Sequence, residues 1–155
     1  MKNKTLLLLI FVVLLSCNEK KADKETTLLP TKILGTWKLI KSMVIEKQDT
    51  VLTNYTANAS FIKIINESHF AFLQHDLKRE KDSVSLFVAG GGTYSLTYSF
   101  YIEHLEYCSD RNWEGNDFAF TIHLKNDTLI QSGIEKIESS GINRFNIETY
   151  IRLRK

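Results

Sequence analysis

Apolar and polar side chains alternate with a period of two along much of the chain after residue 33. Residues 118–125 read Phe-Ala-Phe-Thr-Ile-His-Leu-Lys, and residues 144–153 read Arg-Phe-Asn-Ile-Glu-Thr-Tyr-Ile-Arg-Leu. This alternation is typical of strands that bury one face. Because no segment shows a sustained apolar stripe at helical spacing, the sequence predicts an all-β domain.

The segment that follows residue 33 alternates less regularly, because Lys41 interrupts its apolar series. Its large apolar side chains still share one parity, which predicts one buried face. On this basis we expect one face to carry Trp37, Leu39, Met43 and Ile45, and the other to carry Lys38, Ser42 and Glu46.

Turn-forming residues separate the alternating segments at short intervals. They are Asn66-Glu67, Gly90-Gly91-Gly92, Asn126-Asp127 and Ser139-Ser140-Gly141. Short strands joined by tight turns predict an antiparallel up-and-down meander, and closure of its sheet into a barrel would remove the exposed edges. We therefore expect a closed barrel of about 8–10 strands, as in small up-and-down barrels.

The turns also predict which residues pair. We place a two-residue loop at Asn126-Asp127, a three-residue loop at Ser139–Gly141 and a hairpin tip at Tyr98-Ser99. Cross-strand partners lie on the same face of a sheet. The predicted pairs are Leu124 with Leu129, Ile122 with Gln131, Phe118 with Glu135, Gln131 with Thr149, Glu135 with Phe145, Tyr94 with Glu103, and Leu96 with Tyr101.

These pairs predict a barrel interior that carries both aromatic and polar side chains. A slip of one residue in any strand would reverse the face of that strand. The placement of Phe70 and Phe72 depends on the turn at Asn66-Glu67. The predicted interior residues are Phe70, Phe72, Tyr94, Tyr101, Glu103, Tyr107, Phe118, Phe120, Gln131 and Thr149.

The N-terminus has the composition of an export signal. Met-Lys-Asn-Lys precedes an apolar run over residues 5–15, which is shorter than the ~20 residues that a membrane span needs, and Ser16 is followed by Cys17. This end resembles the lipobox of bacterial lipoproteins. The resemblance implies that residues 1–16 are removed and that Cys17 is acylated; an uncleaved anchor and an ordinary secretory signal are the alternatives.

The rest of the chain divides into a tether and one domain. Residues 17–32 would form the lipidated N-terminus and a flexible, polar tether, and residues 33–155 the barrel domain. Several acyl chains hold a protein firmly on a membrane, so the domain needs no transmembrane helix. We expect a lipid-anchored protein of the cell envelope, on the outer membrane of a Gram-negative bacterium, facing either the periplasm or the surface.

Net charge argues against binding to nucleic acid. The chain has 20 basic and 18 acidic residues, and the loss of Lys2 and Lys4 with the signal would leave 18 of each. Nucleic-acid binding depends on clustered Lys and Arg. We therefore predict no nucleic-acid partner.

Residues 33–39 read Ile-Leu-Gly-Thr-Trp-Lys-Leu. Gly35 and Trp37 resemble the Gly-x-Trp signature of bacterial lipocalin-like domains, in the wider class rather than the lipocalin family proper. The resemblance implies that Trp37 plugs one end of the barrel beneath an arginine of the last strand, through a cation–π contact. We favour Arg152 over Arg154, although the predicted alternation points both outward, so that a bulge or a twist is required.

Glu103 is the most informative polar residue of the predicted interior. A carboxylate on an apolar face must be hydrogen-bonded, paired or protonated. One interpretation is a ligand anchor near Tyr94, Tyr107 and Gln131. The alternatives are an internal polar network, with or without ordered water, and a wrong strand register.

The remaining candidates favour structural roles. His104 and His123 share the predicted outer face, but no spacing matches a zinc motif, so we predict no metal site and no cofactor. Because Cys17 would carry lipid, Cys108 has no partner for a disulfide, and we expect a buried thiol. Gly90–Gly92 lacks the residues of a phosphate loop and is better explained by a strand bend or by a bulge with positive φ. Trp113 either lines the barrel mouth or covers its own loop.

The leading functional hypothesis is a barrel that binds a small apolar or amphipathic molecule without catalysis. The apolar part would pack on the phenylalanines, while Glu103 and the tyrosines would orient a polar end. The second hypothesis is a filled barrel that docks an envelope protein through its rim, around Trp113 and the glycine run. The third, an enzyme that uses Glu103 or a histidine as acid and base, has no motif to support it, and we predict no enzymatic activity.

Overall fold

The computed structural model describes residues 32–77 and 86–154. The predicted signal peptide, Cys17 and the tether up to residue 31 lie outside these residues. The strands are β1 (Gly35–Glu46), β2 (Asp49–Asn54), β3 (Ala59–Ile65), β4 (His69–Asp76), β5 (Phe87–Thr97), β6 (Phe100–Cys108), β7 (Asn116–Lys125), β8 (Thr128–Ile137) and β9 (Ile142–Arg152). Two short 3₁₀ turns, η1 (Arg111–Trp113) and η2 (Glu138–Ser140), lie within loops. In the described part of the chain, no helix has the length and apolarity to cross a membrane.

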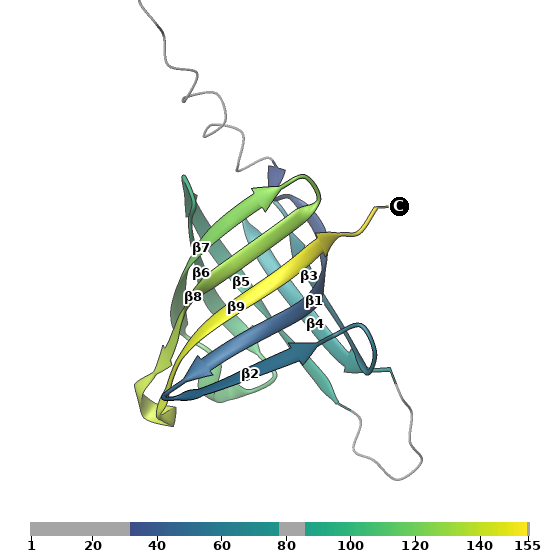
Figure 1. The fold of residues 1–155 in the computed structure, drawn as a ribbon. Helices are drawn as coiled ribbons and strands as arrows, with labels where there is room; N and C mark the ends of the chain where they lie inside the picture. Colours follow the sequence, from purple (N-terminus) through teal and green to yellow (C-terminus); the bar gives the residue numbers. More distant parts are fainter. Residues whose placement is uncertain (1–31, 78–85, 155) are drawn as a thin grey trace, which may run out of the picture.

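The strands form one antiparallel sheet that closes into a barrel (Figure 1). Consecutive strands pair from β3 to β9, and β1 closes the barrel by pairing with β9 on one side and β3 on the other. The second half of β1, Lys41–Glu46, pairs with β2 on the side where its first half pairs with β3, and it stays paired with β9 on the other side; β2 lies outside the barrel circuit. The predicted all-β, lipocalin-like barrel is therefore confirmed, with nine strands in its sheet.

Two of the predicted hairpins have the expected register. Around Asn126-Asp127, Leu124 pairs with Leu129. At the tip formed by Tyr98 and Ser99, strands β5 and β6 pair as predicted, with Tyr94 opposite Glu103. Asn126 and Tyr98 adopt positive φ angles of 54° and 56°, the left-handed conformation that tight hairpin turns use.

The third hairpin differs from the prediction by one residue, which reverses the face of β9. Its loop spans residues 138–141, because η2 begins at Glu138 and Gly141 ends the turn in the left-handed conformation at φ 67°. Ile137 therefore pairs with Ile142, so Gln131 lies opposite Glu148 and not Thr149. Thr149 faces outward, and Arg144, Asn146, Glu148, Tyr150 and Arg152 face the interior.

Bulges reverse two further strand segments. In β6, Gly91 pairs with Tyr107 but Gly92 pairs with Leu105, so Glu106 is an extra residue. Beyond it Tyr107 points outward, 68% exposed, and not into the barrel as predicted. The backbones are crowded here, because a Cβ on Gly92 would lie 2.0 Å from the His104 carbonyl oxygen.

The bulge in β1 lies between Leu39 and Lys41, where the sequence pattern is interrupted. It places Ser42 inside, 6% exposed. Met43 and Ile45, which we predicted to be buried, are therefore on the outer face. The added residue changes the parity of the strand, so the apolar series on each side of Lys41 belongs to a different face.

One end of the barrel is sealed around Trp37, whose side chain is 0% exposed. Its indole N–H donates to the Ile33 carbonyl at 2.8 Å. The Arg152 guanidinium lies 4.1 Å from the indole centroid, and it donates to the carbonyl oxygens of Leu34 and Lys32. The reversed face of β9 thus places Arg152 on Trp37.

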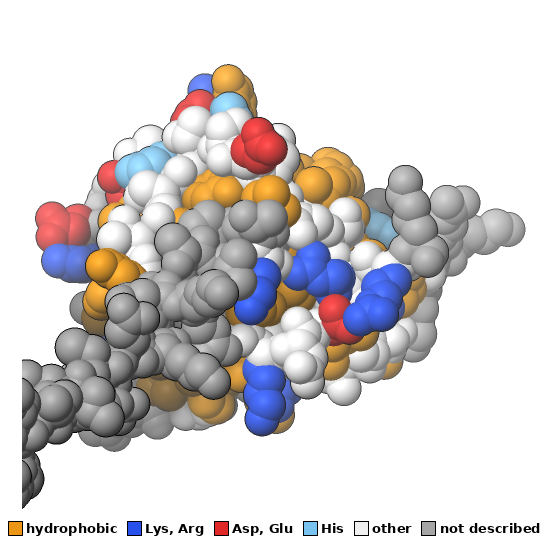
Figure 2. Space-filling view, turned by 90° about the horizontal axis from the view of Figure 1, so that it is seen from above, with side chains coloured by type: hydrophobic (Ala, Val, Ile, Leu, Met, Phe, Trp, Pro, Cys, Tyr) orange, Lys and Arg blue, Asp and Glu red, His pale blue; other side chains and the backbone are white. Residues whose placement is uncertain are grey.

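Gly35 belongs to the same closed end. Its φ is 134°, and a Cβ there would lie 2.7 Å from Arg152 Nη1. A side chain at this position would displace the arginine, so the glycine of the Gly-x-Trp segment makes room for the guanidinium. Arg154 instead pairs with Asp127 at the surface. Figure 2 views this end and shows basic, acidic and hydrophobic side chains interspersed.

Candidate functional site

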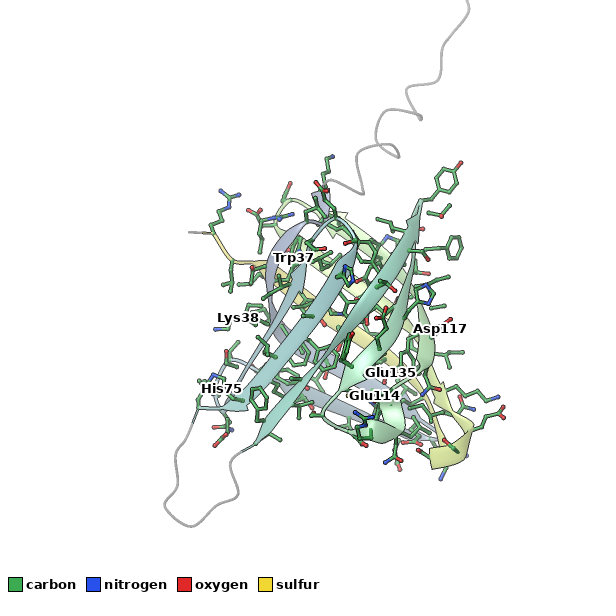
Figure 3. All side chains as sticks on the ribbon, turned by 180° about the vertical axis from the view of Figure 1, so that it is seen from behind. Trp37, Lys38, His75, Glu114, Asp117 and Glu135 are labelled. Carbon is green, nitrogen blue, oxygen red and sulfur yellow. The ribbon has the colours of Figure 1, made fainter. Side chains whose placement is uncertain are left out.

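The reversed β9 places a row of polar side chains inside the barrel. We call Arg144, Asn146, Glu148 and Tyr150 of β9, with Gln131 and Glu135 of β8, the polar stripe. Gln131, Glu135, Asn146 and Tyr150 are each at most 8% exposed. In Figure 3, Trp37 lies toward one end of the barrel and Glu135 toward the other. The stripe thus runs from the closed end toward the opposite end.

Glu103 belongs to an internal ion pair. Lys63 Nζ lies 2.6 Å from Glu103 Oε1 and 3.0 Å from Gln131 Oε1. Lys63 is 2% and Glu103 6% exposed. The Lys63 ammonium also lies 5.3 Å from the centroid of the Tyr150 ring, within the range of a cation–π contact. Glu103 is therefore part of an internal polar network, which was one of the alternatives that the sequence left open for it.

Lys63 is the residue that sequence reasoning missed. It lies on β3 between Phe61 and Ile65, which share its face. The sequence carries no clear signal for this, because residues 61–65 read Phe-Ile-Lys-Ile-Ile and are apolar at both parities around the lysine. Burial of this lysine is possible because it is paired and hydrogen-bonded.

Glu135 organises the part of the stripe near the end opposite Trp37. Its carboxylate accepts hydrogen bonds from Arg144 Nε at 2.6 Å and Asn146 Nδ2 at 2.9 Å. Arg144 also lies over the ring of Trp113, 5.1 Å from its centroid. Trp113 in turn packs on Phe118, with 5.6 Å between the ring centroids. Trp113 therefore lines the barrel mouth, one of the two positions predicted for it.

Glu148 differs from Glu103 and Glu135 because no Lys or Arg of the described residues forms an ion pair with it. Its Oε2 accepts a hydrogen bond from the Tyr150 hydroxyl at 2.7 Å. Burial raises the pKa of Glu148; Lys63 and the Tyr150 hydrogen bond oppose this rise, and Glu135 and Glu103 add to it. Burial and the neighbouring Glu148 also raise the pKa of the Tyr150 phenol. The phenol therefore remains a donor to this carboxylate.

Two buried polar atoms lack a hydrogen-bond partner among residues 32–77 and 86–154. They are the hydroxyl of Tyr101, which is 1% exposed, and Oδ1 of Asn146, which is 5% exposed. The pKa of Tyr101 is raised by burial first and then by Glu103, with smaller effects of Tyr94 and Glu148. The Tyr101 hydroxyl thus lies in the field of the same carboxylates as the polar stripe.

The apolar part of the interior lies on other strands. We call Phe70 and Phe72 of β4, with Phe118 and Phe120 of β7, the aromatic wall. Phe70, Phe118 and Phe120 are at most 4% exposed. Phe72 is only partly buried and stacks on Phe61 at 5.7 Å between centroids. Phe61 meets Tyr55 edge to face at 5.9 Å.

Partly buried apolar side chains occur at both ends of the barrel, and Leu34 and Leu124 are examples at the end that Trp37 seals. Trp37 is fully buried at the closed end, and Tyr150 is fully buried farther inside, with its ring 6.4 Å from that of Phe61. Tyr55, Phe61, Phe72 and Trp113 are only partly buried, away from the Trp37 seal. We call the end that carries these side chains the open end.

A hollow of about 500 Å³ lies over β4, β5 and the end of β6. It is lined on the outer face of the sheet by small residues, Ala71, Ala89 and Gly91, and bordered by His69 and Tyr107. Phe70 and Phe72 line it from the aromatic wall. Strands β4 and β5 lie toward the viewer in Figure 3. This hollow contains Phe70, Phe72 and Tyr107 of the predicted cavity residues, but its lining does not include Glu103.

The other sequence candidates have structural surroundings. His104 Nδ1 lies 2.8 Å from Asp117 Oδ1 on the outside. In the described ranges no three His, Cys, Asp or Glu side chains come together as metal ligands would. The Cys108 backbone N–H donates to Glu114 Oε1 at 2.9 Å, and its partly buried side chain packs against the core. A Cβ on Gly90 would lie 2.4 Å from the Phe72 ring, so this glycine allows the ring to pack.

Most of the predicted cavity residues share the barrel interior. The residues that face it are Phe70, Phe72, Tyr94, Tyr101, Glu103, Phe118, Phe120 and Gln131. Tyr107 and Thr149 face outward, because of the β6 bulge and the loop over residues 138–141. Tyr94 packs on Tyr101 at 5.2 Å and donates its hydroxyl to the Asn66 carbonyl at 2.8 Å.

Comparison with known proteins gave no relative: no protein-family model and no curated protein matches this chain.

Proposed function

We propose that this chain is a lipid-anchored envelope protein whose barrel binds a small amphipathic molecule in its interior, without catalysis. The observation that carries the proposal is the division of the interior into a polar stripe on β8 and β9 and an aromatic wall on β4 and β7. Small barrels either fill with side chains or hold one small ligand. An amphipathic molecule would match both surfaces.

The unpartnered interior atoms support a ligand rather than a purely structural core. A buried donor or acceptor without a partner costs about 1–3 kcal/mol. Tyr101 and Asn146 both carry such an atom beside the polar stripe. A ligand with a polar end would supply the missing hydrogen bonds while its apolar part packs on the aromatic wall.

The seal that Trp37 and Arg152 form at one end favours access through the open end. Phe61, Phe72 and Trp113 are partly buried there. The Arg144 side chain, 31% exposed, extends the polar stripe toward solvent. Both surfaces of the proposed site therefore continue to this end, whereas Trp37 and Arg152 block the other.

Anchoring through Cys17 would leave the open end free. Lys32, the first described residue, lies at the closed end, because its carbonyl accepts a hydrogen bond from Arg152. The lipid-bearing segment would thus join the barrel at its sealed end. A ligand would then reach the barrel from the side that faces away from the membrane.

The proposal is tested by native mass spectrometry of the protein purified from membranes after expression of the full coding sequence. We expect the mass of a diacylglycerol-modified chain that begins at Cys17, and an additional small molecule released on unfolding. A protein that carries neither the lipid nor any small molecule, and that binds no amphipathic compound added in excess, would contradict the proposal.

The hollow on the outside favours one alternative, an interaction module of the envelope. Its small residues Ala71, Ala89 and Gly91 form an apolar depression beside the exposed ring of Tyr107. A photocrosslinker at position 107 would form a defined adduct with an envelope protein under this alternative. Ala71→Arg, which fills the hollow and leaves the interior unchanged, should abolish that adduct.

A further inference from the structure

The charges in the central part of the barrel do not balance. The carboxylates Glu103, Glu135 and Glu148 face the cations Lys63 and Arg144 there, because the third interior cation, Arg152, packs on Trp37 at the closed end and lies 3.6 Å from Asp127. Lys63 is bonded to Glu103 and Arg144 to Glu135, each at 2.6 Å. Glu148 is the carboxylate left over, with the Tyr150 hydroxyl as its hydrogen-bond donor.

One of the two unpartnered interior atoms lies on the same inward face of β9 as this carboxylate. Asn146 shares the inward face of β9 with Glu148, two residues away, and its Nδ2 is bonded to Glu135. Its Oδ1, without a partner among the described residues, can only accept a hydrogen bond. The Tyr101 hydroxyl is the second such atom; burial and then the Glu103 carboxylate raise its pKa most, and Glu148 adds a smaller effect.

The missing group is therefore a cation with several donors. Burial raises the pKa of Glu148, and a cation beside it would oppose that rise and pair with the ionised carboxylate. An anionic end would instead meet three carboxylates, and a neutral hydroxyl would bring no charge to pair with Glu148. A primary ammonium brings one positive charge and three N–H donors. These match the Glu148 carboxylate, Asn146 Oδ1 and the hydroxyl oxygen of Tyr101.

We infer that the interior site takes the ammonium end of an amphipathic primary amine, with Glu148, Asn146 and Tyr101 as its recognition residues. This inference rests on the proposed function, because it names the class of ligand for the same interior. The organic part of the amine would extend toward the open end, where Phe61 and Phe72 stack.

Three small, water-soluble probes that differ at one end test the inference. They are 2-phenylethylammonium, the neutral 2-phenylethanol and the anionic 3-phenylpropanoate. Each is titrated calorimetrically into the full chain in nonionic detergent, and protein-free micelles serve as the blank. We expect the ammonium probe to bind at least about tenfold more tightly than either of the others, the effect of about 1.4 kcal/mol.

Variants separate recognition by these residues from general affinity. Glu148→Gln keeps the shape of the side chain and should remove the preference for the ammonium probe, about tenfold. Tyr101→Phe should weaken that probe by a smaller factor. Glu138→Gln is the matched control, because Glu138 is exposed on η2 and loses the same charge. Thermal unfolding checks that each variant folds.

The outcomes also separate this inference from the proposed function. If all probes bind equally and Glu148→Gln has no effect, the barrel binds amphipathic molecules but the inference is wrong. If the carboxylate probe binds best, Lys63 and not Glu148 selects the ligand, and the inference is again overturned. If no probe binds to the folded chain and no molecule is released from it, both proposals fail, and the unpartnered atoms bind ordered water only.

Discussion

Strands β7 and β9 cross the same barrel wall, and both alternate apolar and polar residues, but they present opposite chemistry to the interior. The inner face of β7 carries Phe118, Phe120 and Ile122, each at most 4% exposed. The inner face of β9 carries Asn146, Glu148 and Tyr150, while Phe145 and Ile151 face outward.

The comparison shows that alternation identifies a strand but not which face is buried. For β7, the hairpins on both sides place the apolar side chains inside. For β9, pairing with β8 and β1 around η2 places its polar side chains inside instead. The polar face is tolerable because Glu135 accepts hydrogen bonds from Arg144 and Asn146, and the Lys63 ammonium lies over the Tyr150 ring. A polar inner face costs stability relative to an apolar one. We propose that ligand binding is the reason why β9 carries it.

The largest expected effect comes from a substitution on the apolar inner face of β7. Phe118→Ala removes a ring that packs on Trp113 and leaves a cavity in the core, which costs about 3–5 kcal/mol for buried phenylalanines. Urea denaturation would measure it. Phe100→Ala is the control, because Phe100 is 64% exposed and should change stability by less than about 0.5 kcal/mol. Equal effects of the two variants would mean that the faces of β6 and β7 are assigned wrongly.

The next effect concerns the ion pair beside the polar stripe. Lys63→Met leaves the Glu103 carboxylate buried without its partner at 2.6 Å, and breaking a buried pair costs about 3 kcal/mol or more. Adding Glu103→Gln should recover most of this loss, because the uncompensated charge disappears. The double-mutant cycle is measured by denaturation. A strictly additive result would show that the two side chains do not interact.

A smaller loss is expected at the closed end. Arg152→Gln removes the cation–π contact with Trp37 and the donors to Leu34 and Lys32. Cation–π contacts contribute about 0.5–2 kcal/mol, so we expect a loss of about 2 kcal/mol with the hydrogen bonds included. Arg154→Gln, on an exposed side chain, should leave stability within about 0.5 kcal/mol. A larger effect of Arg154→Gln would reverse the choice between the two arginines.

The smallest expected effect comes from a substitution on the polar inner face of β9. Burial raises the pKa of Glu148, so the folded protein binds this proton more tightly than the unfolded chain does. The proton bound to Glu148 contributes to the free energy of unfolding. This contribution is fully present below the ordinary glutamate pKa and is lost as pH rises through the raised pKa of the folded state. Glu148→Gln should therefore raise the melting temperature at pH 8, by less than the shift expected for about 1 kcal/mol. The gain should vanish near pH 4, and a gain at pH 4 alone would contradict the raised pKa.

Turn chemistry explains how far the sequence could predict this fold. Asn126-Asp127 and Tyr98-Ser99 form tight hairpins whose length is readable, so the inward faces of β6 and β8, and the paired part of β7, were predicted. The loop before β9 begins at Glu138, which is not a typical turn residue, and the prediction began the loop one residue later. This single residue reverses which face of β9 points into the barrel. Thr149 was misplaced for that reason.

Bulges and buried charges set the remaining limits. The β6 bulge follows from backbone crowding between Gly92 and His104, a long-range contact that alternation does not encode. Tyr107 was misplaced beyond it. Glu103 was identified as interior from its pairing with Tyr94. Its partner Lys63 is 40 residues away in the chain and was missed.

The orientation of β9 is the claim on which the polar stripe, the proposed ligand and its ammonium end all depend. It is tested most directly by maleimide labelling of Asn146→Cys and Phe145→Cys in the native full chain with Cys108→Ser, located by peptide mass mapping. We expect position 145 to react rapidly and position 146 to be protected until the protein unfolds. Rapid reaction at 146 with protection at 145 would return the polar residues to the outside and contradict the account.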